Sequence, residues 1–244
     1  MSVREAPLVA AVFGASGGIG AAMCADLAAR GCGLIHAGSR AGAGPAEIDG
    51  VRPFRFDLAD EAGIAAAAAA MAGEPPEMVL IATGVLTLPD GTGPERGARA
   101  LDGEAMAQVL RINTIGPALI AKHMLPLLPR DRRCVFAALS ARVGSIGDNR
   151  LGGWHSYRAS KAALNMLLRN FALELARTHP QAVVAGLHPG TVDTGLSAPF
   201  QRGLREGQLL APQESVRRLL DVLDRLEPAD SGGVFDWRGE RVPE

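Results

Sequence analysis

Residues 8–20 read LVAAVFGASGGIG, and this stretch decides the fold class. Leu8–Phe13 is a short apolar run, which predicts a buried strand, and Ala21–Arg30 has helical spacing that ends at Gly31. The turn between them, Gly14–Gly20, carries its glycines in the spacing GxxxGxG. Glycines at this place let a diphosphate approach the backbone and sit on the N-terminus of the helix. The segment therefore indicates a strand–turn–helix unit that binds a nucleotide.

The rest of the chain alternates between expected strands and helices. Apolar runs predict strands over Gly33–Gly38, Val51–Phe56, Met78–Ala82, Cys134–Leu139, Ala182–Leu187 and Gly233–Asp236. Helical spacing predicts helices over Asp60–Ala72, Glu104–Leu128, His155–His179 and Pro212–Leu226, the second of them bent near Pro117. This alternation predicts one α/β domain over residues 1–244, a Rossmann-type doubly wound parallel sheet of about seven strands with helices on both faces. A ligand is then expected at the carboxyl ends of the strands.

The composition argues against several classes of protein. Twenty-five basic and 26 acidic side chains leave a net charge of −1, which argues against binding to nucleic acid. The three cysteines form no CxxC pair and the five histidines show no metal-ligand spacing, so we expect reduced thiols, a cytoplasmic location and no metal site. An uncharged run from Ala6 to Ala25 raises the alternative of an export signal or a spanning helix, but four glycines interrupt it. We therefore expect a protein that does not enter a membrane.

The glycine turn permits two other interpretations. Its residues also spell GxSxG, with Ser16 as a nucleophile on a strand-to-helix elbow. An elbow on the first strand leaves no earlier loop to supply an oxyanion donor, and histidines such as His188 are weak partners for a triad. The turn also suits a purely structural role. Its position on the first strand argues against the hydrolase, and the structural role stays the alternative to nucleotide binding.

Tyr157 is the only tyrosine in the chain, and Lys161 follows it four residues later. On the helix expected over His155–His179 the two side chains share one face. A phenol has an ordinary pKa near ~10, and a nearby ammonium favours its anion, which makes it a usable acid and base. A Tyr/Lys pair at this spacing is more often a solvated helix face. It becomes specific because the same chain carries the glycine turn.

GxxxGxG, YxxxK and the turn Pro189-Gly190 stand in the order found in short-chain dehydrogenase/reductases, and the chain resembles this family from Leu8 nearly to its end. Within the family it is similar to the C-factor-like and sniffer-like carbonyl reductases. The segments that carry this likeness are Gly93–Glu95, Asn113–Pro117, Gly144–Asn149 and Gly152-Gly153. The resemblance implies hydride transfer between a nicotinamide cofactor and a carbonyl or secondary alcohol.

The resemblance also implies catalytic roles. Tyr157 would donate or accept the proton at the substrate oxygen, Lys161 would lower the pKa of the phenol and bind the nicotinamide ribose, and Asn113 would hold a water in the proton relay. The family often has a Ser-Ser pair at the end of the fifth strand, whereas this chain reads Ser140-Ala141. We take Ser140 as the residue that binds the substrate oxygen, with Ser145 as the alternative.

Cofactor preference is expected to depend on Ser39-Arg40, at the end of the second strand. An acidic residue there would bind a ribose diol, whereas a hydroxyl and a guanidinium suit a phosphate, so NADP(H) is preferred and NAD(H) is the alternative. Asp57-Leu58 resembles the family's adenine-binding pair, and Thr194 its cofactor-binding threonine. The expected cofactor-binding residues are Gly14, Ser16, Gly18, Ile19, Gly20, Ser39, Arg40, Asp57, Leu58, Thr83, Gly84, Tyr157, Lys161, Pro189, Gly190, Val192 and Thr194.

The expected partners are a small-molecule substrate and further copies of the chain. The helices over Glu104–Leu128 and His155–His179 have more apolar surface than one sheet face needs, which predicts a homodimer or homotetramer. Gly195–Leu210 mixes apolar and charged residues between glycines, which predicts a mobile substrate loop. A nucleotide-binding signalling or sensor protein with little turnover is the alternative function for the same fold.

Overall fold

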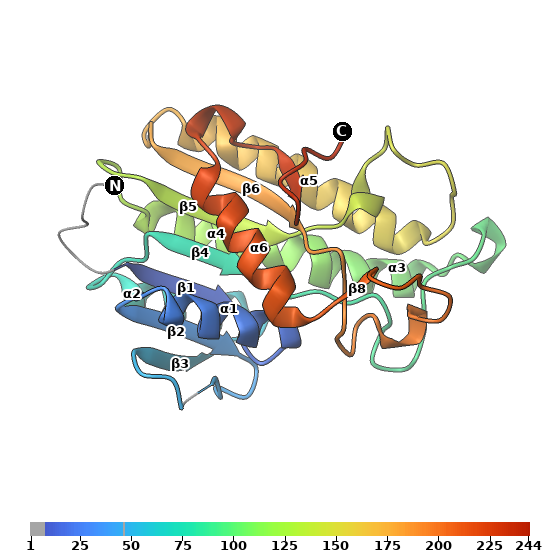
Figure 1. The fold of residues 1–244 in the computed structure, drawn as a ribbon, viewed down its shortest axis with the longest axis horizontal. Helices are drawn as coiled ribbons and strands as arrows, with labels where there is room; N and C mark the ends of the chain where they lie inside the picture. Colours follow the sequence, from blue (N-terminus) through green and yellow to red (C-terminus); the bar gives the residue numbers. More distant parts are fainter. Residues whose placement is uncertain (1–7, 46) are drawn as a thin grey trace.

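The computed structural model describes residues 8–45 and 47–244, and its centre is a parallel sheet of seven strands in the order β3-β2-β1-β4-β5-β6-β9 (Figure 1). The strands of this sheet are β1 (Val9–Phe13), β2 (Leu34–Ser39), β3 (Val51–Arg55), β4 (Met78–Ile81), β5 (Cys134–Leu139), β6 (Ala182–His188) and β9 (Val234–Asp236). The helices are α1 (Gly18–Ala29), α2 (Glu61–Met71), α3 (Gly103–Leu110), α4 (Gly116–Met124), α5 (His155–Leu175) and α6 (Pro212–Arg225). The strand order reverses between β1 and β4, which confirms the predicted Rossmann-type fold. Ala6, where the uncharged run begins, lies outside the described residues.

Side chains that alternate along the central strands fill two separate apolar cores. On β5, Val135 and Ala137 belong to the core beneath α1 and α6, whereas Phe136 and Ala138 belong to the core beneath α2, α4 and α5. Because both faces of the sheet are buried, the inner strands consist almost entirely of apolar residues. Figure 1 shows α1 and α6 crossing the near face of the sheet, with α4 and α5 behind it.

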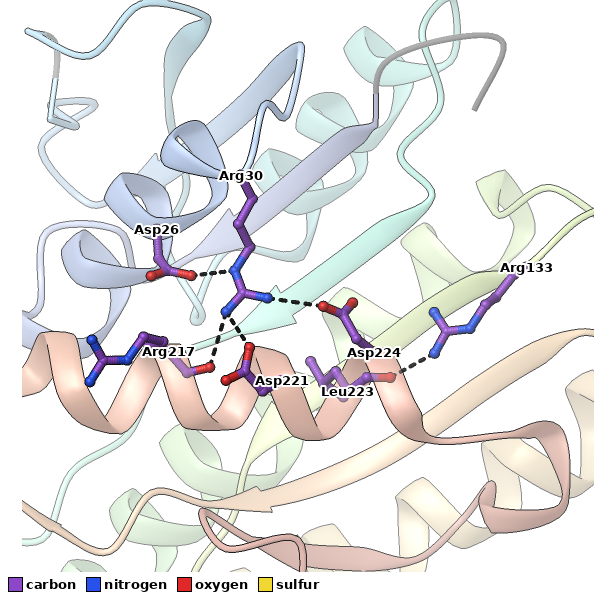
Figure 2. Close-up of polar contacts among 7 residues, drawn as sticks. All are labelled: Asp26, Arg30, Arg133, Arg217, Asp221, Leu223 and Asp224. Atoms are coloured by element: carbon purple, nitrogen blue, oxygen red, sulfur yellow. Dashed lines mark hydrogen bonds and ion pairs between the residues drawn. The ribbon is translucent and has the colours of Figure 1, made fainter. Parts of the chain in front are cut away.

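An ionic cluster ties α1 to α6 at the edge of the sheet where the strands begin (Figure 2). Its centre is Arg30, directly after α1. The guanidinium donates to Asp26 at 2.5 Å, to Asp221 at 2.7 Å, to Asp224 at 2.9 Å and to the carbonyl oxygen of Arg217 at 3.1 Å. Arg133 lies beside this Arg30 cluster and donates to the carbonyl oxygen of Leu223 near the end of α6.

The stretch Glu104–Leu128, expected as one helix bent near Pro117, is helical from Gly103 to Leu127 but contains a π-helical turn that was not predicted. α3 gives way to a π-helical turn at Arg111–Ile115, and α4 follows. The N–H of Gly116 donates to the carbonyl of the residue five positions earlier, one more than in an α-helix. Pro117 supplies the physical reason, because its nitrogen carries no hydrogen for the carbonyl of Asn113. The interruption therefore precedes the proline at which we expected the bend.

Other differences lie at element boundaries. α1 begins inside the glycine turn, earlier than Ala21, and α5 ends at Leu175 rather than His179 because its last turn tightens. The segment 195–210 contains a 3₁₀ turn and the short strand β8 (Leu209–Leu210). This strand pairs in parallel with β7 (Thr191–Val192), a two-stranded ladder that the sequence did not predict.

The three cysteines are buried and form no disulfide. Burial raises the pKa of Cys24 to about 12 and that of Cys134 to about 11, and Cys32 is buried next to the start of β2. Among the described residues, no helix has both the length and the apolar character needed to cross a membrane.

Candidate active site

A cavity of about 870 Å³ opens at the edge of the sheet where the parallel strands end. The glycine turn, the ends of β4, β5 and β6, the first turns of α5 and the segment 195–210 form its walls. In Figure 1 the strand arrows point toward this side, where the orange segment 195–210 lies. The predicted site residues that line the cavity are Gly18, Ile19, Thr83, Gly84, Ser140, Tyr157, Lys161, Pro189, Gly190, Val192 and Thr194.

Three glycines of the turn, Gly14, Gly18 and Gly20, are packed too closely to accept a side chain freely. Gly14 has a φ of 96°, in the left-handed region, and its N–H donates to the carbonyl of Gly38 at 2.9 Å. A Cβ on Gly20 would overlap the carbonyl oxygen of Gly14, and one on Gly18 would lie 2.9 Å from Cγ2 of Thr194. Gly14, Gly20 and the exposed Ser16 shape the turn without lining the cavity. The turn thus presents backbone to the cavity, as a diphosphate site requires.

Tyr157 and Lys161 lie one helical turn apart in α5 and both line the cavity. Nζ of Lys161 is 5.8 Å from the centroid of the Tyr157 ring and donates to the carbonyl oxygen of Leu139 at 2.8 Å. Burial raises the pKa of Tyr157 to about 12 and lowers the pKa of Lys161 to about 8. The lysine is therefore still mostly charged at neutral pH.

The direction of the Tyr157 shift is opposite to the one that the resemblance implied. Burial of the phenol dominates its pKa, and the Lys161 ammonium is hydrogen-bonded to a backbone carbonyl at the end of β5. A buried phenol is harder to ionise because the low-dielectric surroundings disfavour its charged form.

Asn113 is fully buried in the π-helical turn and connects three parts of the site. Its Oδ1 accepts from the N–H of Val85 at 2.8 Å, while Nδ2 donates to the carbonyl of Val85 at 2.9 Å and to Oγ of Ser160 at 3.1 Å. Ser160 in turn donates to the carbonyl of Tyr157 at 2.7 Å. Both amide hydrogens of Asn113 are therefore used, one on the backbone of Val85 and one on Ser160, which bonds to the backbone of Tyr157.

Ser140 lines the cavity directly after β5, but its hydroxyl donates to Oδ1 of Asn165 on α5 at 2.5 Å. Ser145 is buried and does not line the cavity, and its Oγ accepts the N–H of Asp148 at 3.0 Å. Ala141 occupies the next position in the cavity wall. Ser140 can therefore donate to a substrate oxygen only after its hydroxyl breaks the hydrogen bond to Asn165.

Four predicted residues lie at or just after the ends of β2 and β3, outside the lining of this cavity. Ser39 is buried and its hydroxyl donates to a backbone carbonyl at 2.5 Å, whereas Arg40 is exposed and pairs with no described residue. Oδ1 of Asp57 accepts a backbone N–H at 2.9 Å, and Leu58 packs against the start of α4. Arg40 is thus the one group of the Ser39-Arg40 pair whose donors remain unused.

Residues 8–204 match the family described as short chain dehydrogenase, which is more than half of the chain. The chain belongs to this family. The C-signal of Myxococcus xanthus is 39% identical over 144 residues, which make up 59% of this chain and 81% of that protein. The chain spans about half the length of several other curated relatives that it matches.

Two solved structures align over 98% of this chain and 100% of their own. One is a short-chain dehydrogenase/reductase from Burkholderia multivorans with bound NADP, at 29% identity and a TM-score of 0.80. The other is the NADPH-bound carbonyl reductase from chicken fatty liver, at 25% identity and a TM-score of 0.82. The C-signal and the carbonyl reductase agree with the subgroup that the motifs indicated. The family and these structures support an oxidoreductase that uses a nicotinamide cofactor.

The residues of this short-chain dehydrogenase fit a dinucleotide. The glycine turn offers bare backbone at the N-terminus of α1, and the methyl group of Thr194 closes on Gly18. Oγ1 of Thr83 is buried at the cavity wall and has no hydrogen-bond partner among the described residues. An unsatisfied buried hydroxyl is costly unless a ligand meets it.

Trp154 and His188 also line the cavity, and neither was predicted as a site residue. Trp154 contacts Tyr157 edge to face, with ring centroids 6.2 Å apart, and contacts Phe200 from the segment 195–210 at 5.2 Å. His188 ends β6 with Nδ1 buried and unpartnered among the described residues, and burial lowers its pKa to about 4. Its place directly before Pro189-Gly190 was the available signal.

Proposed function

We propose that the chain is an NADP(H)-dependent carbonyl reductase that acts on a carbonyl or secondary alcohol. The observation that carries the proposal is the placement of Tyr157 and Lys161 on successive turns of α5, buried in the cavity that the glycine turn also lines. The NADPH-bound carbonyl reductase among the aligned structures supports the reaction class.

The residues that would hold the cofactor come from both halves of the sheet. The glycine turn would hold the diphosphate, Thr194 and Thr83 would contact the nicotinamide half, and Arg40 would meet the 2′-phosphate. Asp57-Leu58 would contact the adenine. When bound, the nicotinamide supplies or takes the hydride.

Tyr157 gives its phenolic proton to the carbonyl oxygen during reduction and takes it back during oxidation. Lys161, charged at neutral pH, lowers the free energy of the resulting phenolate and binds the ribose. The main-chain carbonyl of Asn113 lacks an N–H partner at Pro117 and holds the water that returns a proton toward Lys161. Ser140 binds the substrate oxygen.

The reaction class is tested by NADPH oxidation against a panel of aldehydes and ketones. Turnover of at least one member supports a reductase. Tight NADPH binding with no turnover of any member supports the signalling or sensor alternative, which the likeness to a protein named C-signal keeps open. The serine assignment is tested in the same assay, where Ser140→Ala lowers kcat and Ser145→Ala does not.

Cofactor preference is tested with Arg40→Ala. Losing one exposed charge-assisted contact to a phosphate is expected to weaken NADPH binding by roughly tenfold. The dissociation constant for NADH is the internal control, because that cofactor lacks the 2′-phosphate. Equal weakening of both cofactors, or tighter binding of NADH by the wild type, would contradict the NADP(H) preference.

We propose a homodimer or homotetramer through α5 and the π-helical turn. Ile115, Met166 and Leu173 leave 50%, 62% and 52% of their surface exposed on these neighbouring elements. Sedimentation of the wild type and of Met166→Glu tests this. A wild type that sediments as a single chain at micromolar concentration would reject the oligomer.

The segment 195–210 is proposed to act as the substrate loop. Its Phe200 rests on Trp154, while Arg202, Arg205 and Glu206 are exposed. Amide hydrogen exchange should be faster here than in β5 without ligand and should slow when NADPH and a substrate are added. Exchange that is slow from the outset and unchanged by both would show that the segment is part of the rigid scaffold.

A further inference from the structure

The helix that carries Tyr157 starts without a cap of its own. Gly152, Gly153 and Trp154 have φ values of 63°, 65° and 50°, and Trp154 is the only non-glycine residue with a positive φ among the described residues. Trp154 stands at the N-cap without a side-chain hydrogen bond, and the first turn of α5 contains no acidic residue. Tyr157 follows three residues after the cap. Its position therefore depends on whatever satisfies the free N–H groups of this turn.

Glu95, from the loop between β4 and α3, supplies that cap from outside the helix. One carboxylate oxygen accepts the N–H of Ser156 at 3.1 Å and the other accepts the Ser156 hydroxyl. Its main-chain carbonyl accepts the N–H of Trp154 at 2.5 Å. Glu95 is only 8% exposed, so these hydrogen bonds are shielded from water.

The charge of Glu95 suits this place. A carboxylate at the N-terminus of a helix is stabilised by the free N–H groups and the helix dipole. Burial is the largest single influence and raises the pKa of Glu95, but the hydrogen bonds from Ser156, a backbone hydrogen bond at Glu95 and the nearby His155 together keep that pKa below its ordinary value. The side chain therefore remains an anion at neutral pH and accepts on both oxygens.

Trp154 connects the Glu95 cap to the phenol of Tyr157. With its backbone held by Glu95, Trp154 packs edge to face on the ring of Tyr157 and on Phe200 of the proposed substrate loop. Releasing the cap would let the first turn of α5 tilt, and the phenol would move with it. A displacement of about 1 Å at a reacting group can cost roughly 10²-fold in rate.

We propose that Glu95 is a positioning residue, which caps α5 from a separate loop and thereby fixes Trp154 and the phenol of Tyr157 for proton transfer. The proposal rests on the reductase function proposed above. It also gives a role to Glu95 of the Gly93–Glu95 segment, which carries part of the likeness to the sniffer-like reductases.

The test compares Glu95→Gln and Glu95→Ala with Asp60→Ala. Asp60 caps α2 by accepting the N–H of Gly63 at 3.1 Å and does not line the cavity, so its loss removes a helix cap without removing a group from the cavity wall. We expect Glu95→Ala to lower kcat roughly 10²-fold and Glu95→Gln, which keeps an acceptor oxygen, roughly tenfold. The dissociation constant for NADPH should stay near that of the wild type in both Glu95 variants. Asp60→Ala should lower Tm with kcat unchanged.

A spectroscopic measurement separates this proposal from the reductase function. In a Trp237→Phe background Trp154 is the only tryptophan, and its emission should shift in Glu95→Ala and not in Asp60→Ala, whether or not any carbonyl is reduced. Wild-type kcat in Glu95→Ala, or an unshifted Trp154 emission, would overturn the positioning role. A wild type that reduces no carbonyl would instead remove the proposed reaction and leave the emission result to decide whether Glu95 holds the turn.

Discussion

The Arg30 cluster and the Glu95 cap both join distant segments through charge, at opposite edges of the sheet. In the Arg30 cluster the arginine side chain is 31% exposed and the partners Asp221 and Asp224 are 53% and 58% exposed. Glu95 is almost fully buried and bonds mainly to neutral backbone and hydroxyl groups. Exposed ion pairs are each worth little and are screened by salt, whereas a buried acceptor that loses its donors has no water to replace them.

The difference indicates that the two edges of the sheet serve different purposes, one for stability and the other for the geometry of the site. The edge where the strands begin holds α1 against α6 with several weak, replaceable contacts. The edge where they end holds Tyr157, Lys161 and Glu95 in a few buried contacts, each of which fixes geometry. Substitutions at the first edge should change stability modestly, and those at the second should change chemistry, nucleotide binding or pH behaviour.

Tyr157→Phe should give the largest effect. It removes the phenolic proton that the proposed reaction delivers to the substrate oxygen, so kcat for NADPH-dependent reduction should fall by ~10³-fold or more while the dissociation constant for NADPH changes little. Steady-state kinetics and a fluorescence titration measure the two. Arg30→Met, at the opposite edge, is the control with wild-type kcat. Activity that survives Tyr157→Phe would exclude the proposed proton transfer.

Gly20→Ala should unfold or loosen the turn that faces the cavity. Its Cβ would overlap the carbonyl oxygen of Gly14, which is backbone and cannot move aside freely. We expect a loss of ~3 kcal/mol in the free energy of unfolding, measured by urea denaturation. Gly73→Ala is the matched control, because a Cβ there meets nothing within 4 Å. Equal stability of the two variants would show that the turn can accommodate a Cβ at Gly20, contrary to the structure.

Lys161→Met should change how the free energy of unfolding depends on pH, because it removes a buried ammonium. The pKa of Lys161 is about 8 in the folded protein against 10.5 for an unperturbed lysine. The unfolded chain thus binds more protons between these values, and stability rises with pH there. The free energy of unfolding of the wild type relative to Lys161→Met should therefore increase by ~2 kcal/mol from about pH 8 to about pH 10 and stay flat below about pH 7. A difference independent of pH would mean that the amine is not desolvated.

Arg30→Met should give the smallest effect. It keeps the aliphatic stem and removes the guanidinium, so the free energy of unfolding should drop by ~1 kcal/mol at low salt. The difference should shrink in high salt, because most of these charges face water. Thermal unfolding of both proteins at two salt concentrations measures it. If salt left the loss of unfolding free energy unchanged, the Arg30 cluster would behave as a buried contact and the comparison would fail.

Features that depend on local sequence were predictable. The inner strands are continuous apolar runs, the glycine turn has its own spacing, and Tyr157 and Lys161 share a helix face by their separation alone. The π-helical turn was missed because Pro117 marks a break without specifying its form. The Glu95 cap was missed because its partners lie 61 residues along the chain. The absence of any acidic residue in the first turn of α5 was the one local sign that a cap had to come from elsewhere.

The burial of Cys24, Cys32 and Cys134 makes the chain convenient for site-directed labelling. Reagents that modify cysteine need an accessible thiolate, and burial raises the pKa of two of these thiols and encloses all three. A cysteine introduced at Leu151, which is 90% exposed at the rim of the cavity, would therefore react far ahead of them. A single dye at that position would report movement of the segment 195–210 against the rim during turnover, without any native cysteine having to be replaced.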